Sequence, residues 1–152
     1  MVAVLITGMS GVGKSTALAG LARRGFHVVD TDDPGWVHVV DGERLWREDR
    51  IAAVLAAPGP APLFVSGTVR NQGRFADRFA AIVLLTAPVD VLLDRIRRRS
   101  TNDFGKRDDE RAAILRDVAE TEPLLRRTAT HVLDATEPPE VVLDRIVALA
   151  AG

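Results

Sequence analysis

The chain has 152 residues, a formal net charge of -1 and a pI of about 6.3, and 47 % of its residues are hydrophobic while 5 % are aromatic. These values predict one domain with an aliphatic core and give no sign of a nucleic-acid or anionic membrane surface. The absence of cysteine excludes disulfides, iron–sulfur clusters and thiolate zinc sites. No apolar run approaches the roughly 20 residues that span a bilayer, so we expect a cytoplasmic protein.

Short apolar runs alternate with helical patterns along the chain. Residues 2–6 are apolar on both faces and predict a buried strand, and residues 15–24 predict a helix that Gly25 ends. Further strands are expected at 26–30, 63–67, 80–87 and 130–135, and further helices at 41–57, 89–99, 109–127 and 138–151. This order predicts an α/β fold of three layers (α/β/α) around a five-stranded parallel sheet, as a single domain over residues 1–152. The polar segment 100–110 is the candidate lid.

The sequence "GMSGVGKST" follows the first strand and opens the first helix. Its pattern Gly-x-x-x-x-Gly-Lys-Ser is that of a P-loop, whose glycines let backbone N–H groups surround a phosphate. The lysine reaches the outer phosphates, and the hydroxyl of Ser15 is a ligand for Mg²⁺. The glycine spacing does not fit a dinucleotide-binding G-x-G-x-x-G turn. The nucleotide-binding residues predicted here are Gly8, Ser10, Gly11, Val12, Gly13, Lys14, Ser15 and Thr16.

The second predicted strand ends in "DTDD", residues 30–33. Carboxylates at the carboxyl end of a parallel strand face the ligand crevice, where one can join a magnesium shell and another can accept a proton from a substrate hydroxyl. A capped turn is the alternative, since aspartate and Pro34-Gly35 suit turns.

Besides the P-loop, four stretches carry a resemblance to a known family: "VVDTDD", "DGERLWRE", "ERAAILRDVAETEPLLRRTATHVLDAT" and "PPEVVLDRIV". The family that nearly the whole chain resembles is shikimate kinase. That family belongs to the P-loop small-molecule kinases, together with gluconate kinase and the nucleoside monophosphate kinases. The resemblance implies a shikimate/adenylate-kinase-like fold with ATP and Mg²⁺ as cofactors. It places Asp30 in the magnesium shell, Asp32 on the acceptor hydroxyl, and Arg47 on the acceptor's carboxylate.

The resemblance also assigns residues further along the chain. The loop after the last strand, with Ala135, Thr136 and Pro138, would lie against the adenine ring, and "SGTVR" would bring Gly67 and Arg70 to the acceptor or the transferred phosphate. Arg95 and Arg99, one helical turn apart in "DRIRRR", are expected to face the phosphates from the lid helix, with Lys106 as an alternative contact. Trp36 flanks the expected acceptor pocket, where stacking on a substrate and core packing are both open.

Three departures from the family pattern concern the acceptor. The family's triple glycine after the third strand is "VSGTVRNQG" here, an acceptor-binding arginine before the proline of "PL" is Glu122, and Ser66 replaces an aspartate. Loss of that arginine weakens the case for shikimate itself.

The sequence therefore predicts a Mg²⁺-dependent kinase that transfers the γ-phosphoryl group of ATP to a small hydroxylated metabolite or a nucleoside monophosphate. An antibiotic-inactivating phosphotransferase and a regulatory ATPase without an acceptor remain as alternatives, as does GTP in place of ATP. The expected partner is the small-molecule acceptor, with no nucleic acid or membrane, and the chain is expected to act as a monomer or homodimer.

Overall fold

The computed structural model describes residues 2–9, 11–57, 59–98 and 108–151. Within them the central sheet has five parallel strands in the order β2–β5–β1–β6–β7, so the first strand lies in the middle. The strands are β1 (Ala3–Gly8), β2 (His27–Asp30), β5 (Leu63–Ser66), β6 (Ala81–Thr86) and β7 (His131–Asp134). The predicted α/β class and parallel five-stranded sheet are confirmed.

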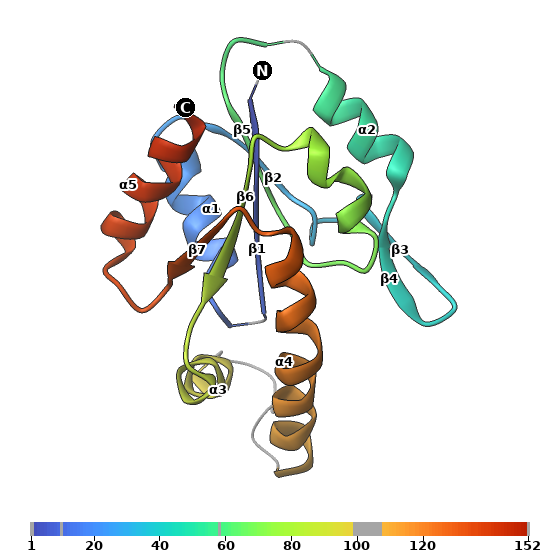
Figure 1. The fold of residues 1–152 in the computed structure, drawn as a ribbon, viewed down its shortest axis with the longest axis vertical. Helices are drawn as coiled ribbons and strands as arrows, with labels where there is room; N and C mark the ends of the chain where they lie inside the picture. The colour runs from blue at the N-terminus through green and yellow to red at the C-terminus, as the bar shows by residue number, and fades with distance from the viewer. Residues whose placement is uncertain (1, 10, 58, 99–107, 152) are drawn as a thin grey trace.

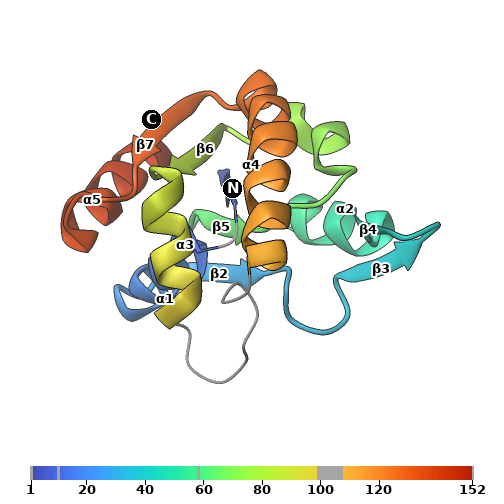
Figure 2. The same ribbon diagram turned by 90° about the horizontal axis from the view of Figure 1, so that it is seen from below.

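Helices cover both faces of this sheet (Figure 1). On one face lie α1 (Lys14–Arg23) and α5 (Pro139–Ala150), and on the other lie α2 (Glu48–Ala56), the 3-10 helix η1 (Gln72–Arg78) and α4 (Asp108–Thr128). Helix α3 (Val89–Arg98) lies beyond the carboxyl ends of the strands, beside α4 (Figure 2). This end of the sheet is where a parallel α/β fold binds its ligands.

The central strands are apolar on both faces because both faces are covered. In β1, Val4 and Ile6 belong to a core cluster with α1 and α5, whereas Ala3 and Leu5 belong to a second cluster with α2 and η1. The strict alternation of these side chains follows from the period of two along a strand. Burial on both sides explains why the strand pattern could be recognised as a continuous apolar run.

The single helix predicted over residues 41–57 is wrong in its first half. Residues 41–46 are instead the turn and the second strand of an antiparallel hairpin of β3 (Val37–Val40) and β4 (Glu43–Trp46), and the helix begins only at Glu48. Asp41 and Gly42 at the turn have φ angles of 52° and 79°, as a two-residue hairpin turn with a right-handed strand twist requires. Trp46 ends β4 fully buried, with its ring edge-on to Phe75. The hairpin projects away from the sheet at the ligand-binding end (Figure 1).

The predicted lid falls mostly outside the described part of the chain. Residues 99–107 are not described, and residues 108–110 form the first turn of α4.

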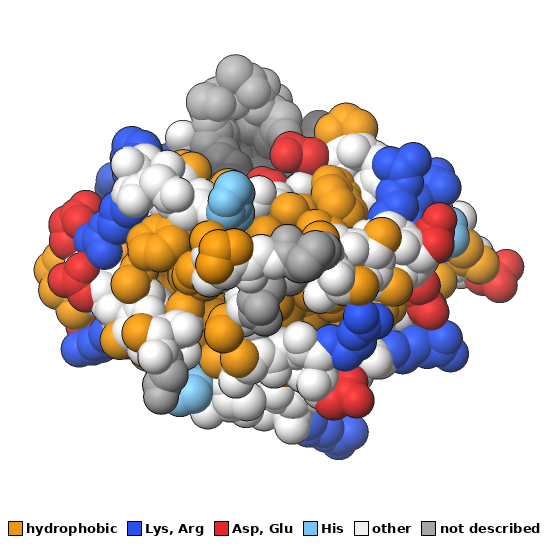
Figure 3. Space-filling model, turned by 90° about the horizontal axis from the view of Figure 1, so that it is seen from above, with side chains coloured by type: hydrophobic (Ala, Val, Ile, Leu, Met, Phe, Trp, Pro, Cys, Tyr) orange, Lys and Arg blue, Asp and Glu red, His pale blue; other side chains and the backbone are white. Residues whose placement is uncertain are grey.

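None of the helices in the described ranges combines the length and apolar character that crossing a bilayer needs. Seen from the end at which β1 begins, hydrophobic side chains gather in the middle and charged side chains lie around the rim (Figure 3). The polar cavities described next lie at the opposite end.

Candidate active site

The P-loop joins the end of β1 to the start of α1. Gly11 and Gly13 have φ angles of 84° and 111°, a region that side-chain-bearing residues rarely adopt, and Gly13 is the N-cap of α1. A Cβ on Gly11 would lie 3.0 Å from Cγ1 of Ile96, so the loop is packed closely against α3. Both glycines are therefore required by the backbone path. Ser10, predicted in the same loop, lies outside the described residues.

Lys14 is folded back over this loop. Its Nζ donates to the carbonyl oxygens of Gly8 at 2.7 Å and Met9 at 3.1 Å. These carbonyls hold the ammonium group at the mouth of the loop, between two cavities that both have Lys14 in their walls. The lysine side chain is flexible, so a short movement would take its ammonium group from these carbonyls to a bound phosphate.

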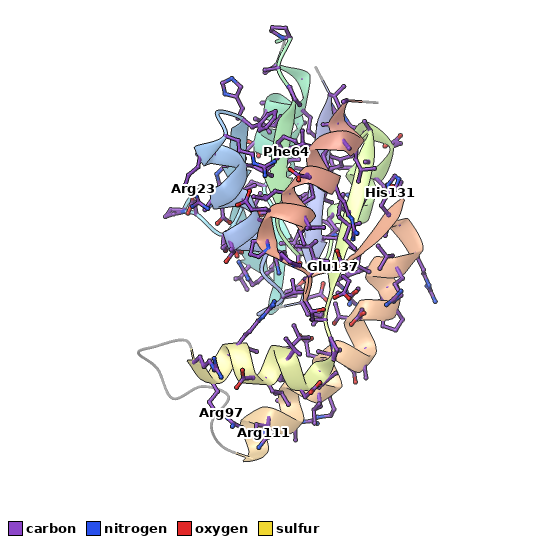
Figure 4. All side chains as sticks on the ribbon, turned by 90° about the vertical axis from the view of Figure 1, so that its left-hand side faces the viewer. Arg23, Phe64, Arg97, Arg111, His131 and Glu137 are labelled. Carbon is purple, nitrogen blue, oxygen red and sulfur yellow. The ribbon has the colours of Figure 1, made fainter. Side chains whose placement is uncertain are left out.

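The first cavity has a volume of about 690 Å³ and lies between the P-loop, the start of α1 and the loop after β7. Arg23 and Glu137 also line it, which the sequence analysis missed, and Figure 4 shows them on α1 and at the start of the α5 segment. Gly8 is in the wall of the second cavity instead. The predicted nucleotide-binding residues that line the first cavity are Gly11, Val12, Gly13, Lys14, Ser15, Thr16, Ala135, Thr136 and Pro138.

Arg95 joins the two sides of this first cavity. Its Nη1 donates to the carbonyl oxygens of Val12 at 2.8 Å and Gly11 at 3.5 Å, and its Nη2 donates to that of Ala135 at 3.2 Å. The guanidinium therefore ties α3 to both the P-loop and the loop after β7. Arg99, predicted to act with it, lies outside the described residues.

Other arginines of the lid helix point elsewhere. Arg98 is exposed and pairs with Asp94 on its own helix at 3.2 Å. Arg97 is also exposed, and Figure 4 places it with Arg111 on the α3–α4 pair, beyond the end of the sheet. This agrees with the expectation that consecutive arginines on one helix cannot all face one site.

The loop after β7 is shaped by Asp134. Its Oδ1 accepts hydrogen bonds from the hydroxyl of Thr136 and from the Thr136 N–H at 2.8 Å. These two hydrogen bonds, the hydroxyl first, lower the pKa of the Asp134 carboxyl below its usual value. The carboxylate thereby fixes the turn that brings Ala135 and Thr136 to the first cavity.

The second cavity, of about 460 Å³, lies on the other side of Lys14. One wall is the hairpin, through Glu43 and Arg44, and the opposite wall is one face of α4, through Asp117 and Thr121. Asp32 is in the walls of both cavities, as Lys14 is. Further lining residues come from the segment after β5: Thr68, Val69, Arg70 and Gln72.

Two ion pairs cross the hairpin side of the second cavity. Arg44 Nη2 lies 3.2 Å from Asp32 Oδ1, and Arg70 Nε lies 3.6 Å from Glu43 Oε1. The backbone supports them, since the Arg70 N–H donates to the Arg44 carbonyl oxygen at 3.1 Å. All four side chains are about half or more exposed, so they are free to exchange partners with a ligand.

A polar network of buried and half-buried residues lies along the second cavity. Gln72 Nε2 donates to Thr7 Oγ1 at 3.1 Å, and this hydroxyl lies 3.1 Å from that of Thr68. Thr68 in turn donates to the Gly8 carbonyl oxygen, the same oxygen that accepts from Lys14. Satisfied buried hydrogen bonds of this kind hold a backbone rigidly. The network therefore fixes the end of β1 from the side of the second cavity.

Four residues predicted for the site lie outside both cavity walls. Arg47 is exposed as the N-cap of α2, and its N–H donates to the Trp36 carbonyl oxygen at 2.7 Å. Trp36 itself is half-buried and packs against the core cluster beneath the hairpin. Gly67 is buried against Thr31 and Trp46 rather than facing a cavity.

The fourth of these residues, Asp30, is at the end of β2. Its Oδ1 accepts from the Asp32 N–H at 2.9 Å, which forms the capped turn considered as the alternative for "DTDD". This turn aims the Asp32 side chain toward the hairpin. The stretch forms the capped turn at Asp30, and Asp32 lines both cavities.

The sequence analysis missed the hairpin residues Glu43 and Arg44 and the α4 residue Asp117. A signal for the first two exists, because Asp41-Gly42 between apolar alternating residues is a strong hairpin pattern. For Asp117 no local signal exists, since which face of a polar helix meets the cavity depends on how α4 packs.

The fold and the site define a P-loop nucleotide-binding protein with a second cavity beside the one at the P-loop. A protein-family model described as "AAA domain" matches residues 4–116. Shikimate kinase from Rhodopseudomonas palustris is 31 % identical, and the match covers 95 % of this chain and 79 % of that protein. Shikimate kinase 2 from Yersinia enterocolitica is 29 % identical, and the match covers 97 % of this chain and 95 % of that protein. The chain belongs to the shikimate kinase family and is an ATP-dependent small-molecule kinase.

Solved structures agree on the fold. A shikimate kinase from Bacteroides thetaiotaomicron superposes with a TM-score of 0.72 at 20 % identity, covering 99 % of each chain. A gluconokinase from Sinorhizobium meliloti superposes with a TM-score of 0.65 at 18 % identity, covering 99 % of this chain and 91 % of that one. The same fold thus carries kinases for different acceptors, and the acceptor must be argued from the site itself.

Proposed function

We propose that the chain transfers the γ-phosphoryl group of ATP, bound in the first cavity, to a hydroxyl group of a small molecule bound in the second. The observation that carries this proposal is that Lys14 and Asp32 line both cavities. A group transferred between two bound molecules must pass between their sites, and these two side chains stand at that junction.

Each of the two residues has a chemical role there. The acceptor oxygen forms a bond to the γ-phosphorus while the bond from that phosphorus to the β–γ bridging oxygen breaks, so ADP leaves. Asp32 accepts the proton of the acceptor hydroxyl, and the ammonium of Lys14 offsets charge on the phosphoryl oxygens. Catalysis of this kind depends on positioning and charge neutralisation rather than on a covalent intermediate.

The residues of the first cavity fit ATP with Mg²⁺. Gly11 and Gly13 leave the loop open for phosphate, and Ser15 is exposed in the cavity wall. The described residues contain no cluster of three or more His, Cys, Asp or Glu side chains able to hold an ion alone. That suits Mg²⁺, which is usually bound by one or two protein ligands together with the phosphates of the nucleotide. Ser15 would bind Mg²⁺ there, and Mg²⁺ would neutralise charge on the phosphate oxygens, whereas Asp30, which the resemblance placed in the magnesium shell, lies outside the wall of this cavity.

Arginines complete the proposed machinery. Arg95 holds the P-loop and the loop after β7 together, and we propose that it positions the nucleotide. We propose that Arg99 reaches the phosphates. On the acceptor side, Arg44 rather than Arg47 lies in the cavity wall, and we propose that it orients Asp32, which it contacts. Arg70 lies in the same wall.

The test is ADP release from purified protein with Mg-ATP across a panel of acceptors. The panel holds shikimate, gluconate, nucleosides, nucleoside monophosphates and aminoglycosides, with Lys14→Ala as the blank. We expect one chemical class to stimulate ADP release strongly. Asp32→Asn should then lower kcat by about 100-fold or more with little change in the KM for ATP. Asp33→Asn is the matched control, because Asp33 is the exposed neighbour that lines neither cavity.

Two outcomes would contradict the proposal. Steady ATP hydrolysis that is indifferent to every acceptor would leave a regulatory ATPase as the better account of the P-loop. Equal effects of Asp32→Asn and Asp33→Asn would remove Asp32 from the transfer step.

A further inference from the structure

We propose that the acceptor carries a protonated amine beside its hydroxyl groups, and that the ammonium group binds at Asp117 in the second cavity. This inference rests on the proposed function and names the chemical class of its acceptor. It follows from the charged side chains that line the cavity. Lys14 lies at the junction with the first cavity, where the Gly8 and Met9 carbonyl oxygens accept from its Nζ, and the other charges lie on the hairpin side and on α4.

The hairpin wall holds cations that are already compensated. Arg44 is paired with Asp32, and Arg70 with Glu43, and all four residues line the same cavity. A carboxylate or phosphate on the acceptor would have to displace one of these carboxylates and would then lie beside it. The hairpin wall therefore offers an anionic acceptor little net attraction.

The α4 wall holds a carboxylate that has no ion-pair partner in the described parts of the chain. Asp117 is exposed and lines the cavity, and its one contact among the described residues is the Thr121 hydroxyl, which donates to Oδ1 at 3.1 Å. Thr121 lies one turn further along α4, so this contact leaves most of the carboxylate's hydrogen-bonding capacity open to a ligand. An ammonium group is the cation that a small hydroxylated metabolite most commonly supplies.

None of the α4 arginines in the described residues forms an ion pair with the Asp117 carboxylate. Arg126 pairs with Glu122 at 3.1 Å on its own helix, and Arg111, Arg116 and Arg127 are not in the cavity wall. Glu122 stands where the resemblance expects an arginine for an acidic acceptor, so that cation is missing at this position, and Glu122 itself is paired with Arg126 outside the cavity wall.

The rest of the α4 wall suits a carbon skeleton with hydroxyl groups. Leu124 and Leu125 line the cavity together with the hydroxyl-bearing Thr121 and Thr128, and Leu124 is 42 % exposed although it is a large apolar side chain. These residues lie on one face of the helix, about one turn apart. An amino sugar or amino alcohol would place apolar C–H groups on the leucines, hydroxyls near the threonines and Asp32, and its ammonium at Asp117.

The experiment measures ADP release with acceptors paired by charge. Glucosamine and kanamycin represent amine-bearing polyols, their N-acetylated forms remove the positive charge, and shikimate, gluconate and nucleoside monophosphates represent anions. We expect at least one amine-bearing compound to give a kcat/KM at least 10-fold above its N-acetylated form and above every anion. Asp117→Asn should reduce this kcat/KM by 10-fold or more through the KM of the acceptor, with the KM for ATP unchanged, and Asp117→Glu should restore part of it.

The matched control is Glu120→Gln. Glu120 is an exposed acid on the same helix that lines neither cavity, so its neutralisation should leave both KM values within twofold. An anionic acceptor that works best, or an Asp117→Asn variant with the same acceptor KM as the unaltered protein, would overturn the inference and leave the proposed kinase function standing. A failure of every acceptor to stimulate ADP release would overturn both.

Discussion

The Asp32 carboxylate and the Arg44 guanidinium lie 3.2 Å apart and join the end of β2 to the hairpin β3–β4. Asp32 faces both cavities, so the residue proposed to accept the proton is held from the side of the acceptor. The contact makes the hairpin part of the site rather than a peripheral addition to the sheet.

The first prediction compares Arg44→Ala with Arg47→Ala. Loss of Arg44 should lower kcat/KM for the acceptor by about 10-fold, because Asp32 loses the partner that orients it. Both side chains of the pair are more than half exposed, so the free energy of unfolding should change by no more than about 1 kcal/mol. Arg47→Ala should leave kcat/KM nearly unchanged, since Arg47 lies outside both cavity walls. Steady-state kinetics with chemical denaturation checks both variants, and a larger loss in Arg47→Ala would contradict the prediction.

The second prediction concerns the shape of the Lys14 side chain as well as its charge. Lys14→Arg keeps the positive charge but replaces a compact ammonium by a planar guanidinium, which does not match the two carbonyls of Gly8 and Met9. We expect this variant to lose about 100-fold or more in kcat, close to Lys14→Ala. Both variants should melt within a few degrees of the unaltered protein, because the half-buried side chain is at the surface of the loop. Near-normal turnover by Lys14→Arg would show that charge alone is sufficient.

The third prediction concerns packing beneath the acceptor cavity. A Cβ on Gly67 would lie 2.1 Å from Thr31 Oγ1, which donates to the Ser66 carbonyl oxygen at 2.7 Å and accepts from Trp46 Nε1 at 3.0 Å. Gly67→Ala must therefore displace Thr31 or the backbone and should cost about 1–3 kcal/mol in the free energy of unfolding. Gly59→Ala is the control, because no atom lies within 4 Å of the added Cβ. Urea denaturation of the two variants separates them, and equal midpoints would contradict the packing argument.

Gly67 also illustrates where the sequence was informative and where it was not. The resemblance placed Gly67 at the acceptor through the "SGTVR" motif, and in the structure Gly67 lies outside both cavity walls with no room for a Cβ beside Thr31. The P-loop could be predicted in full, since all of its groups come from one continuous stretch whose conformation its glycines dictate. The strands could be predicted because burial on both faces leaves a continuous apolar signal.

The acceptor cavity could be predicted only in part, because it is assembled from separate segments. Its walls bring together the P-loop, Asp32, the hairpin, the segment after β5 and α4. Leu45 and Trp46 fit a helical pattern as well as a strand pattern. The second strand of the hairpin is therefore predicted as the start of a helix, although Asp41-Gly42 indicates a turn. Which side of α4 meets the cavity is decided by long-range packing, and no local pattern records it.

The fourth prediction is a pH dependence at the loop after β7. The two hydrogen bonds from Thr136 hold the pKa of Asp134 below its usual value, so the folded protein binds this proton more weakly than the unfolded chain does. The stabilisation from this carboxylate is therefore complete above the unfolded-state pKa of about 4 and is lost as the pH falls through the lower folded-state value. Asp134→Asn should be less stable than the unaltered protein at pH 7, and the difference should shrink steadily between about pH 4 and pH 2.

Urea denaturation at a series of pH values measures this difference, and Thr136→Val is the partner variant. It removes the hydroxyl donor, which is the largest cause of the lowered pKa, and keeps the N–H donor, so it should reproduce part of the effect. Both variants should also raise the KM for ATP, because the turn that they loosen carries Ala135 and Thr136 into the wall of the first cavity. A stability difference between Asp134→Asn and the unaltered protein that stays constant from pH 7 to pH 2 would exclude the carboxylate's charge as its source. A loss of stability without any rise in the KM for ATP would mean that the Arg95 contact to Ala135 holds the loop in place instead.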